Sequence, residues 1–209
     1  MIKVAITDDH PLLLEGLKNI LENSPEIEVT GCFRNVKEMN TGLSEQAVDI
    51  LLLDINLADI NSIEIIRPLK KKYSDLQIII LSVHNELPVI NSTLAEGAMG
   101  YIQKNASVSE ILEGISSVYS GKRFLCMQTH SILEKQSENG LNHVPKLTRR
   151  EKEILAEAAK GLTTNQMAEK LFISPHTVES HRKNLIEKFQ TANLSSAIKL
   201  AIEYGLIIE

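Results

Sequence analysis

Short apolar runs alternate with helical patterns along the first 120 residues, and this alternation constrains the fold more than any other feature. Each run has the length of a strand, and each is followed by a stretch with helical spacing. The runs are Ile2–Ile6, Ile27–Cys32, Val48–Leu53, Leu76–Leu81 and Gly100–Gln103. Strands that alternate with helices in this way form a parallel sheet covered on both sides. The pattern predicts an α/β fold with a doubly wound five-stranded parallel sheet over residues 1–121.

The pattern changes twice after residue 121. Residues 122–145 are polar and lack regular spacing, which is typical of a linker, with a short helix expected around Ser131–Lys135. From residue 146 to residue 209 the spacing is helical throughout. Helix-start signals stand at Thr148–Glu151, Thr163–Gln166 and Ser174-Pro175, and a fourth helix is expected at about Ser195–Tyr204. The second and third helices are separated by a short turn, so we expect a small all-α four-helix domain with a helix-turn-helix.

Composition excludes several classes of protein. Of the 209 residues 43% are apolar and 23% are charged, which is ordinary for a globular chain. Apolar runs such as Ile50–Leu53 are far shorter than the ~18 residues of a membrane span, and the N-terminus lacks the pattern of a secretory signal. Two cysteines, Cys32 and Cys126, cannot form a disulfide framework. We therefore expect a cytoplasmic protein with no membrane partner.

The net charge of −5 is unevenly distributed along the chain. Residues 1–140 carry a net charge of −7, whereas residues 141–209 carry +2. This change of sign suggests two domains with different partners. The small positive excess permits nucleic-acid binding by the second domain but does not by itself argue for it.

Five polar residues follow the predicted strands at their carboxyl ends. Asp8 and Asp9 follow the first strand, Asp54 the third, Ser82 the fourth and Lys104 the fifth. Ligands of parallel α/β sheets bind at this edge. Three neighbouring carboxylates repel one another, and Mg²⁺ with its oxygen ligands would neutralise them. Asp54 would then act as a nucleophile toward a phosphoryl group, with Lys104 offsetting its charge and Ser82 hydrogen-bonding an oxygen.

This set of residues resembles the receiver domain of two-component response regulators, over about residues 1–120. The resemblance implies a flavodoxin-like sheet and implies that Asp54 accepts a phosphoryl group from a histidine kinase. It also implies a Mg²⁺ site formed by Asp9, by Asp8 mainly through water, by Asp54, and by the backbone carbonyl of Asn56.

The resemblance further implies that Ser82 and Tyr101 form a switch pair that moves when phosphate arrives. The loop after Asp54 departs from the family pattern, which usually has Met-Pro where Leu57-Ala58 stand and Gly where Ser62 stands. These changes remove a rigid turn and a permissive backbone position. His10 and His84 lie near the same edge, where we expect them to be loop residues and not metal ligands.

The third helix of the C-terminal domain has one apolar and one polar face. Counted at 100° per residue from Ser174, Val178, Leu185 and Phe189 fall on one stripe. The opposite side carries His176, Ser180, Lys183 and Glu187, flanked by Glu179, while Arg182, Lys183 and Lys188 offer donors for phosphates or bases. The second helix of a helix-turn-helix enters the DNA major groove. The pattern alone leaves both DNA binding and a solvated helical bundle open.

Several segments of this domain resemble the LuxR-type DNA-binding domain over about residues 147–207. They are Leu147–Leu155, Gly161–Thr163, Ala168–Ser174 and Thr177–His181. The resemblance implies double-stranded DNA as the partner, with base contacts from His176, Glu179, Ser180 and Lys183 and a backbone contact from Arg182. Leu194 and Gln166 depart from the family, which often has Arg and Glu there, and Glu179 is acidic where many relatives are basic or neutral.

Dimerisation is a further implication of the LuxR-type resemblance. Glu179 can accept from a cytosine amino group but repels phosphates, so a homodimer on DNA would raise an otherwise modest affinity. In this family the last helix commonly forms the dimer contact, although Ile198, Ala201 and Ile202 are equally compatible with a plain core. The whole chain resembles a NarL/FixJ-type transcriptional regulator. It would not be an enzyme beyond Mg²⁺-dependent self-phosphorylation and dephosphorylation at its aspartate.

Two other functions compete with this interpretation. A metal-dependent phosphohydrolase on the same sheet would also use an acidic cluster with Mg²⁺. However, the chain has no Asp-x-Asp run after a strand, no Gly-x-Ser-x-Gly elbow and no Gly-x-x-x-x-Gly-Lys loop. Alternatively, the first domain is a receiver and the second is a protein-interaction bundle. Binding to DNA separates this alternative from the main one.

Overall fold

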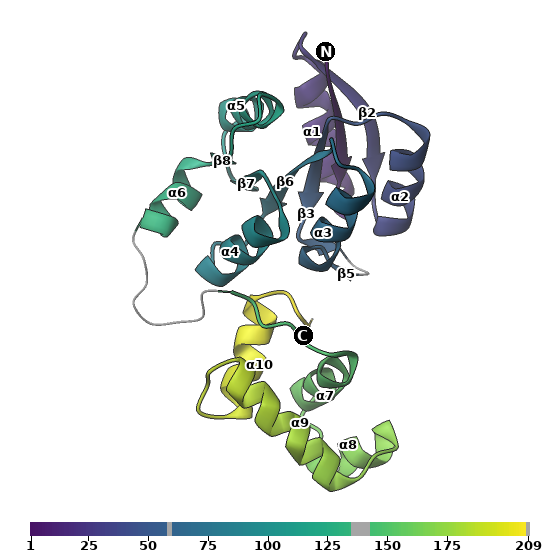
Figure 1. The fold of residues 1–209 in the computed structure, drawn as a ribbon, viewed down its shortest axis with the longest axis vertical. Helices are drawn as coiled ribbons and strands as arrows, with labels where there is room; N and C mark the ends of the chain where they lie inside the picture. Colours follow the sequence, from purple (N-terminus) through teal and green to yellow (C-terminus); the bar gives the residue numbers. More distant parts are fainter. Residues whose placement is uncertain (58–59, 135–142, 208–209) are drawn as a thin grey trace. The chain divides into compact units, whose positions relative to one another are not determined.

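The computed structural model describes residues 1–57, 60–134 and 143–207 of the chain. The chain divides into two compact units, Met1–Glu138 and Asn139–Glu209. The first is an α/β unit and the second is helical (Figure 1). Within the described ranges, no helix is long and apolar enough to cross a membrane.

A parallel sheet with the strand order β2-β1-β3-β6-β7-β8 forms the centre of the first unit. Its strands are β1 (Ile2–Thr7), β2 (Ile27–Phe33), β3 (Ile50–Asp54), β6 (Gln77–Ser82), β7 (Gly100–Gln103) and β8 (Phe124–Leu125). Two strands of two residues each, β4 (Asn56–Leu57) and β5 (Ile60–Asn61), follow β3 and pair antiparallel with each other. The first five strands confirm the predicted doubly wound, flavodoxin-like order. The predicted number of five is wrong by one, because β8 is too short to show an alternating pattern.

Helices cover both faces of this sheet (Figure 1). Helices α1 (Pro11–Glu22) and α5 (Val108–Tyr119) contribute to one apolar cluster with the strands. Helices α2 (Val36–Glu45), α3 (Ile63–Lys72) and α4 (Leu87–Glu96) pack on the opposite side. Residues Ile50–Leu53 of β3 are all completely buried. A central strand covered on both faces has no polar side, which explains its continuous apolar run.

Part of the predicted linker at residues 122–145 belongs to the first unit. Strand β8 and helix α6 (Met127–Glu134) occupy residues 124–134. The Phe124 amide donates to the Met99 carbonyl at 3.0 Å, and the Cys126 amide donates to the Tyr101 carbonyl at 3.1 Å. These bonds join the segment to β7. The short helix expected in the linker is present but starts earlier than predicted, and residues 135–142 lie outside the described part.

Four helices form the described part of the second unit, as the sequence predicts. They are α7 (Arg149–Ala159), α8 (Thr164–Leu171), α9 (Pro175–Lys188) and α10 (Leu194–Glu203). Both predicted capping boxes are confirmed, because the side chains of Thr148 and Thr163 accept from the backbone three residues on and receive the reciprocal bond. The Ser174 side chain caps α9, and Pro175 is at its first position. Helices α8 and α9 with their short turn form the helix-turn-helix.

Candidate functional site

The register of the sheet brings the predicted site residues to one edge. Thr7 pairs with Leu53, Asp54 with Leu81 and Ser82 with Gln103. The carboxyl ends of β1, β3, β6 and β7 are therefore level with one another. Asp8 follows β1, Asp54 and Ser82 are the last residues of β3 and β6, and Lys104 follows β7. Parallel pairing thus gathers residues that are up to about a hundred positions apart in the chain.

Lys104 bridges two buried carboxylates. Its Nζ atom lies 2.7 Å from Asp8 Oδ2 and 2.8 Å from Asp54 Oδ2. The Asp8 side chain is fully buried, and only 4% of the Asp54 side chain is exposed. Burial alone would lower the pKa of the Lys104 ammonium, but the hydrogen bonds to Asp54 and Asp8 outweigh burial, so its pKa is raised. The ammonium is therefore a permanent positive charge beside Asp54.

Asp54 has a strongly shifted pKa. Burial raises the pKa of its carboxyl to about 6, the bond from Lys104 opposes this shift, and the charge of Asp8 adds to it. One ammonium thus faces the carboxylates of Asp8, Asp9 and Asp54. The site is short of positive charge when all three are ionised.

The donor atoms at this edge fit a divalent cation. Carboxylate oxygens of Asp8, Asp9 and Asp54 and a ring nitrogen of His10 all lie within 4.8 Å of one another. Carboxylate oxygens are the ligands that hard dications take, and such an ion would supply the missing charge. The Asn56 amide donates to Asp54 Oδ1 at 3.3 Å, so Asn56 also lies beside the cluster. The structure thus brings together the carboxylates of Asp8, Asp9 and Asp54, which the resemblance assigned to a metal site, and places the fourth assigned residue, Asn56, beside Asp54.

His10 is a loop residue, as expected, and its ring contacts two carboxylates of this cluster. Its Nδ1 atom lies 2.9 Å from Asp8 Oδ1 and 2.8 Å from Asp9 Oδ1. Its backbone amide also donates to Asp8 Oδ1 at 2.9 Å. The residue directly precedes α1, where Pro11 starts the helix. The adjacency of His10 to Asp8 and Asp9 in the sequence was the signal for this contact.

Ser82 and Tyr101, the expected switch pair, meet at the backbone of His84. The Ser82 hydroxyl accepts from the His84 amide at 3.0 Å, and the Tyr101 hydroxyl donates to the His84 carbonyl at 3.0 Å. Tyr101 is completely buried. Burial raises the pKa of its phenol, although a hydrogen bond with Ser82 opposes this, so the hydroxyl stays neutral.

The side chain of His84 connects two loops at the site, which the sequence did not indicate. The Asn56 side-chain amide donates to His84 Nε2 at 2.7 Å, and His84 Nδ1 lies 3.2 Å from Glu86 Oε2. Since the amide nitrogen can only donate, the proton of the neutral ring is on Nδ1. The loop after β3 is thereby tied to the loop after β6. This contact arises only when the two strand ends are adjacent.

The departure from the family pattern at Ser62 is compatible with the backbone there. Ser62 has φ −65° and ψ −15°, which any residue adopts, and its amide donates to the Ile55 carbonyl at 2.8 Å. No glycine is required at this position. The Leu57-Ala58 departure falls partly on residue 58, which lies outside the described residues.

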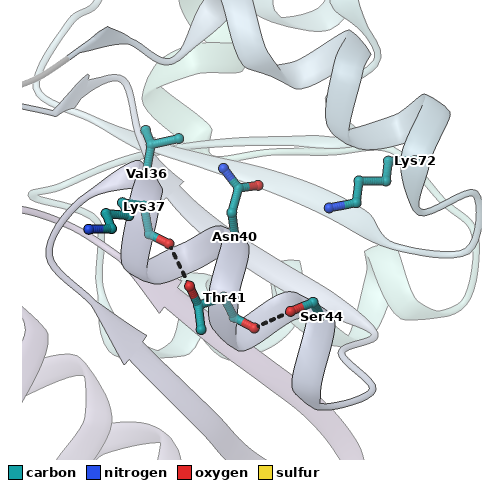
Figure 2. A pocket seen from close by; sticks show the side chains of 6 residues that line it. All are labelled: Val36, Lys37, Asn40, Thr41, Ser44 and Lys72. Atoms are coloured by element: carbon teal, nitrogen blue, oxygen red, sulfur yellow. Dashed lines mark hydrogen bonds between the residues drawn. The ribbon is translucent and has the colours of Figure 1, made fainter.

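A groove of about 570 Å³ lies elsewhere on the first unit (Figure 2). It is lined by Val36, Lys37, Asn40, Thr41, Ser44 and Lys72. Figure 2 shows that its two hydroxyls bond to carbonyls of their own helix, Thr41 to Lys37 and Ser44 to Thr41. No carboxylate lines it, and it shares no residue with the acidic cluster. This groove therefore has no part in the chemistry of Asp54.

Helix α9 of the second unit has the two faces that its sequence predicts. Val178, Leu185 and Phe189 are buried in the helical core. His176, Glu179, Ser180 and Lys183 are exposed, and Arg182 is half-buried. These five residues are the ones the sequence assigned to DNA contacts.

Two of these residues are held in an ion pair on the helix-turn-helix. Arg182 Nη1 lies 3.1 Å from Glu179 Oε1, and both side chains contact the Thr164 hydroxyl at the start of α8. Glu179 thus fixes the guanidinium of Arg182 between α8 and α9. Lys188, a further candidate donor in the sequence, lies 2.7 Å from the buried carboxylate of Glu151 and has a structural role.

Residues of the last helix, α10, differ in how deeply they are buried. Ala201 is completely buried, so it belongs to the core, whereas Ile198 and Ile202 are only partly buried. The sequence left open whether these three residues are core or a dimer contact. The structure assigns Ala201 to the core.

Comparisons with known proteins agree with both units. A model of the response regulator receiver domain matches residues 4–116, and a model of the luxR family of bacterial regulatory proteins matches residues 145–201. The chain is 32% identical to the response regulator UvrY of Escherichia coli K12, over 99% of this chain and 96% of that one. It is also 32% identical to the transcriptional regulatory protein LnrK of Bacillus subtilis, over the full length of both.

Solved structures share the fold. RcsB from Salmonella enterica serovar Typhimurium, bound to a promoter in the presence of the phosphomimetic BeF₃⁻, is similar with a TM-score of 0.65 and 23% identity, over 99% of both chains. With a receiver unit, a LuxR-type helix-turn-helix unit and relatives aligned over their whole length, this chain belongs to the NarL/FixJ family of two-component response regulators.

Proposed function

We propose that phosphorylation of Asp54, with a histidine kinase as the donor and Mg²⁺ as the cofactor, controls the binding of this regulator to double-stranded DNA. The observation that carries the proposal is the position of the Asp54 carboxylate. It lies at the end of β3, 2.8 Å from the ammonium of Lys104 and next to the carboxylates of Asp8 and Asp9. A carboxylate nucleophile flanked by positive charge suits phosphoryl transfer.

Each residue of the site has a distinct role in this proposal. Mg²⁺ would be held by Asp9 and Asp54, by Asp8 mainly through water, and by the backbone carbonyl of Asn56. It would neutralise charge on the phosphoryl oxygens. An Asp54 oxygen attacks the phosphorus, a new phosphorus–oxygen bond forms, and the bond to the donor's leaving group breaks. Lys104 pairs with the incoming oxygens. Hydrolysis of the aspartyl phosphate returns the protein to its starting state.

The signal passes to the rest of the unit through Ser82 and Tyr101. Phosphorylation adds about −1.5 to −2 charges and strong acceptor oxygens beside Ser82. A Ser82 hydroxyl that turns to donate to a phosphoryl oxygen gives up its bond with the His84 amide. The bond from Tyr101 to the His84 carbonyl then changes with that loop. Tyr101 pairs with Leu125 across β7 and β8, so the change reaches the segment that precedes the second unit.

The second unit binds the DNA major groove through the exposed face of α9. Base edges are reached by His176, Glu179, Ser180 and Lys183. Arg182 contacts the backbone, with its guanidinium also held by Glu179. A homodimer that engages two half-sites multiplies the effective affinity.

Footprinting on genomic DNA with and without a small phosphodonor tests the proposal. Turnover of many phosphomonoesters per chain would instead support a phosphohydrolase, and the absence of any footprint would support a protein-interaction bundle.

Replacing Lys183 by alanine is expected to weaken specific DNA binding by about 1–3 kcal/mol and to relax base preference. The Lys183 side chain is 78% exposed on α9 and lies 4.0 Å from Glu187. Lys199→Ala is a closely matched control, because Lys199 is 79% exposed on α10 and lies 3.8 Å from Glu203. Equilibrium electrophoretic shifts measure both variants. Equal losses in the two variants would contradict a groove contact by Lys183.

Replacing Glu179 by glutamine is expected to raise affinity for DNA of unrelated sequence. Glutamine keeps an oxygen that accepts from Arg182 and Thr164 but removes the negative charge that repels phosphates. We expect the gain to be largest at low salt and the dependence of log affinity on log salt to become steeper. Salt titrations monitored by fluorescence anisotropy measure this, with Glu203→Gln on α10 as the control for net charge. Unchanged affinity at low salt would show that the α9 face does not approach phosphates.

A further inference from the structure

The hydroxyl of Thr164 joins the two helices of the helix-turn-helix. Thr164 is the first residue of α8, whereas Glu179 and Arg182 lie on α9. The hydroxyl donates to Glu179 Oε1 and accepts from Arg182 Nη1. The same Glu179 oxygen accepts from Arg182 at 3.1 Å, so the three side chains form a closed triangle of hydrogen bonds. Capping does not explain the Thr164 contacts, because Thr163 and Gln166 form the capping box of α8.

This triangle leaves one oxygen of Glu179 available for a ligand. Both donors bind Oε1, and Oε2 makes no hydrogen bond to any residue that the structure describes. The side chain is 56% exposed, and Glu179 is the fifth residue of α9, among the early positions of a recognition helix that reach base edges. Arg182 holds the carboxylate from the same helix, whereas Thr164 holds it from the neighbouring helix. Bonds from two helices restrict rotation of the side chain, so Oε2 has a defined direction.

An oxygen of this kind discriminates between bases. An ionised carboxylate can only accept hydrogen bonds. The base donors in the major groove are the amino groups of cytosine and adenine. Adenine presents the acceptor N7 beside its amino group, and this acceptor repels a carboxylate, whereas cytosine itself presents no acceptor at this edge. A fixed Glu179 Oε2 therefore favours cytosine.

We propose that Thr164 is a positioning residue for base readout, which holds Glu179 so that Oε2 accepts from the amino group of one cytosine in each half-site. This inference rests on the proposed function, because it requires α9 to lie in the major groove of DNA. In the competing arrangement the three hydrogen bonds only tie α8 to α9. Removal of the Thr164 hydroxyl would then weaken binding to all DNA sequences alike and would leave the preference for one base unchanged.

Duplexes that carry a methyl group on the amino nitrogen of one cytosine test this inference. Selection from a random duplex library by the full-length wild type, with acetyl phosphate and Mg²⁺ present, first gives the preferred half-site. Each of its cytosines is then methylated in turn, which removes the major-groove donor and keeps the pair with guanine. The cytosine whose methylation no longer matters in Glu179→Ala is the one that Glu179 reads. If no cytosine behaves in this way, the inference is overturned.

The ratio of the dissociation constants for methylated and unmethylated DNA is the quantity to compare. At the cytosine read by Glu179, we expect methylation to weaken binding about tenfold for the wild type and about threefold or less for Thr164→Val. Valine keeps the shape of threonine and lacks only the hydroxyl. The ratio compares two DNAs on one protein, so a general loss of affinity or of folded protein cancels. Equal ratios in the wild type and Thr164→Val would overturn the inference.

Two further variants show whether the hydroxyl and its position are responsible. Thr164→Ser keeps a hydroxyl at the first position of α8 and is expected to restore the wild-type ratio. Thr191→Val is the matched control, because the Thr191 hydroxyl donates to the Asn193 carbonyl, outside the helix-turn-helix. We expect it to keep the wild-type ratio. A fall in Thr191→Val equal to that in Thr164→Val would contradict a specific role of Thr164.

The failure of this inference is distinguishable from failure of the proposed function. If the wild type selects no sequence from the library, α9 does not read DNA, and both the proposed function and the inference fail. If the wild type selects a half-site and Thr164→Val keeps its methylation ratio, DNA binding stands and only the role of Thr164 is refuted. If Thr164→Val instead lowers the ratio at cytosines that Glu179→Ala leaves unaffected, Thr164 acts through another residue, which also overturns the inference.

Discussion

The Asp54→Asn variant is expected to take up no phosphoryl group from acetyl phosphate in the presence of Mg²⁺, whereas the wild type forms an adduct that hydroxylamine or alkali removes. The Asp54 carboxylate is the one that Lys104 contacts at the end of β3, and the Asn56 amide donates to it. An amide in its place has nearly the same shape but is not a nucleophile at phosphorus. Intact mass spectrometry, or phosphate-affinity electrophoresis, measures the fraction of labelled chains after a fixed time.

Asp75→Asn is the control for this experiment. Asp75 is exposed and precedes β6, at the opposite end of the strands from the acidic cluster. Its replacement is expected to leave labelling at the wild-type level. Labelling of Asp54→Asn to the wild-type extent would assign the nucleophile to a different carboxylate and refute the proposed site.

The same Asp54→Asn substitution stabilises the first unit by about 3 kcal/mol above pH 7 in the absence of metal. Burial raises the pKa of Asp54 from 3.8 to about 6, so between these values the folded state binds more protons than the unfolded state. The favourable contribution of this carboxyl is complete below about pH 4 and is lost as the pH rises through 6, since each pKa unit corresponds to about 1.4 kcal/mol. Asparagine carries no charge to desolvate. Lys104 keeps Asp8 as a partner at 2.7 Å.

Amide hydrogen exchange of peptides from β3 and β6 measures this effect in the full chain, because it follows the first unit separately from the second. The expected difference in the free energy of unfolding of the first unit, Asp54→Asn against the wild type, is small at pH 4. It grows as the pH rises to about 6 and then stays constant. Added Mg²⁺ is expected to reduce the difference by stabilising the wild type. The prediction would be contradicted if Asp54→Asn were less stable than the wild type above pH 7 with a chelator present to remove metal ions. The attraction between the Asp54 carboxylate and Lys104 would then be stronger than the cost of burying the carboxylate.

Local patterns predicted much of the fold correctly because their physical causes are local. The apolar run of β3 reflects burial on both faces, and capping boxes such as Thr148–Glu151 involve residues three positions apart. Strand β8 was missed because its two residues are held by pairing with β7, supported by the bond from the following Cys126 amide to the Tyr101 carbonyl, and not by their own pattern. The same long-range pairing explains why part of the predicted linker belongs to the first unit.

The candidate site also has features that the sequence predicted and features that only the structure shows. The sequence by itself determined which polar residues meet at one edge of the sheet. The strand ends of a parallel sheet lie at one edge, and Asp8, Asp9, Asp54, Ser82 and Lys104 stand at those ends. Only the tertiary structure decided how these groups act on one another. Burial raises the pKa of Asp54, His10 turns toward two carboxylates, and His84 joins two loops. Such effects depend on distance and on exclusion of water, which exist only after segments far apart in the chain have packed together.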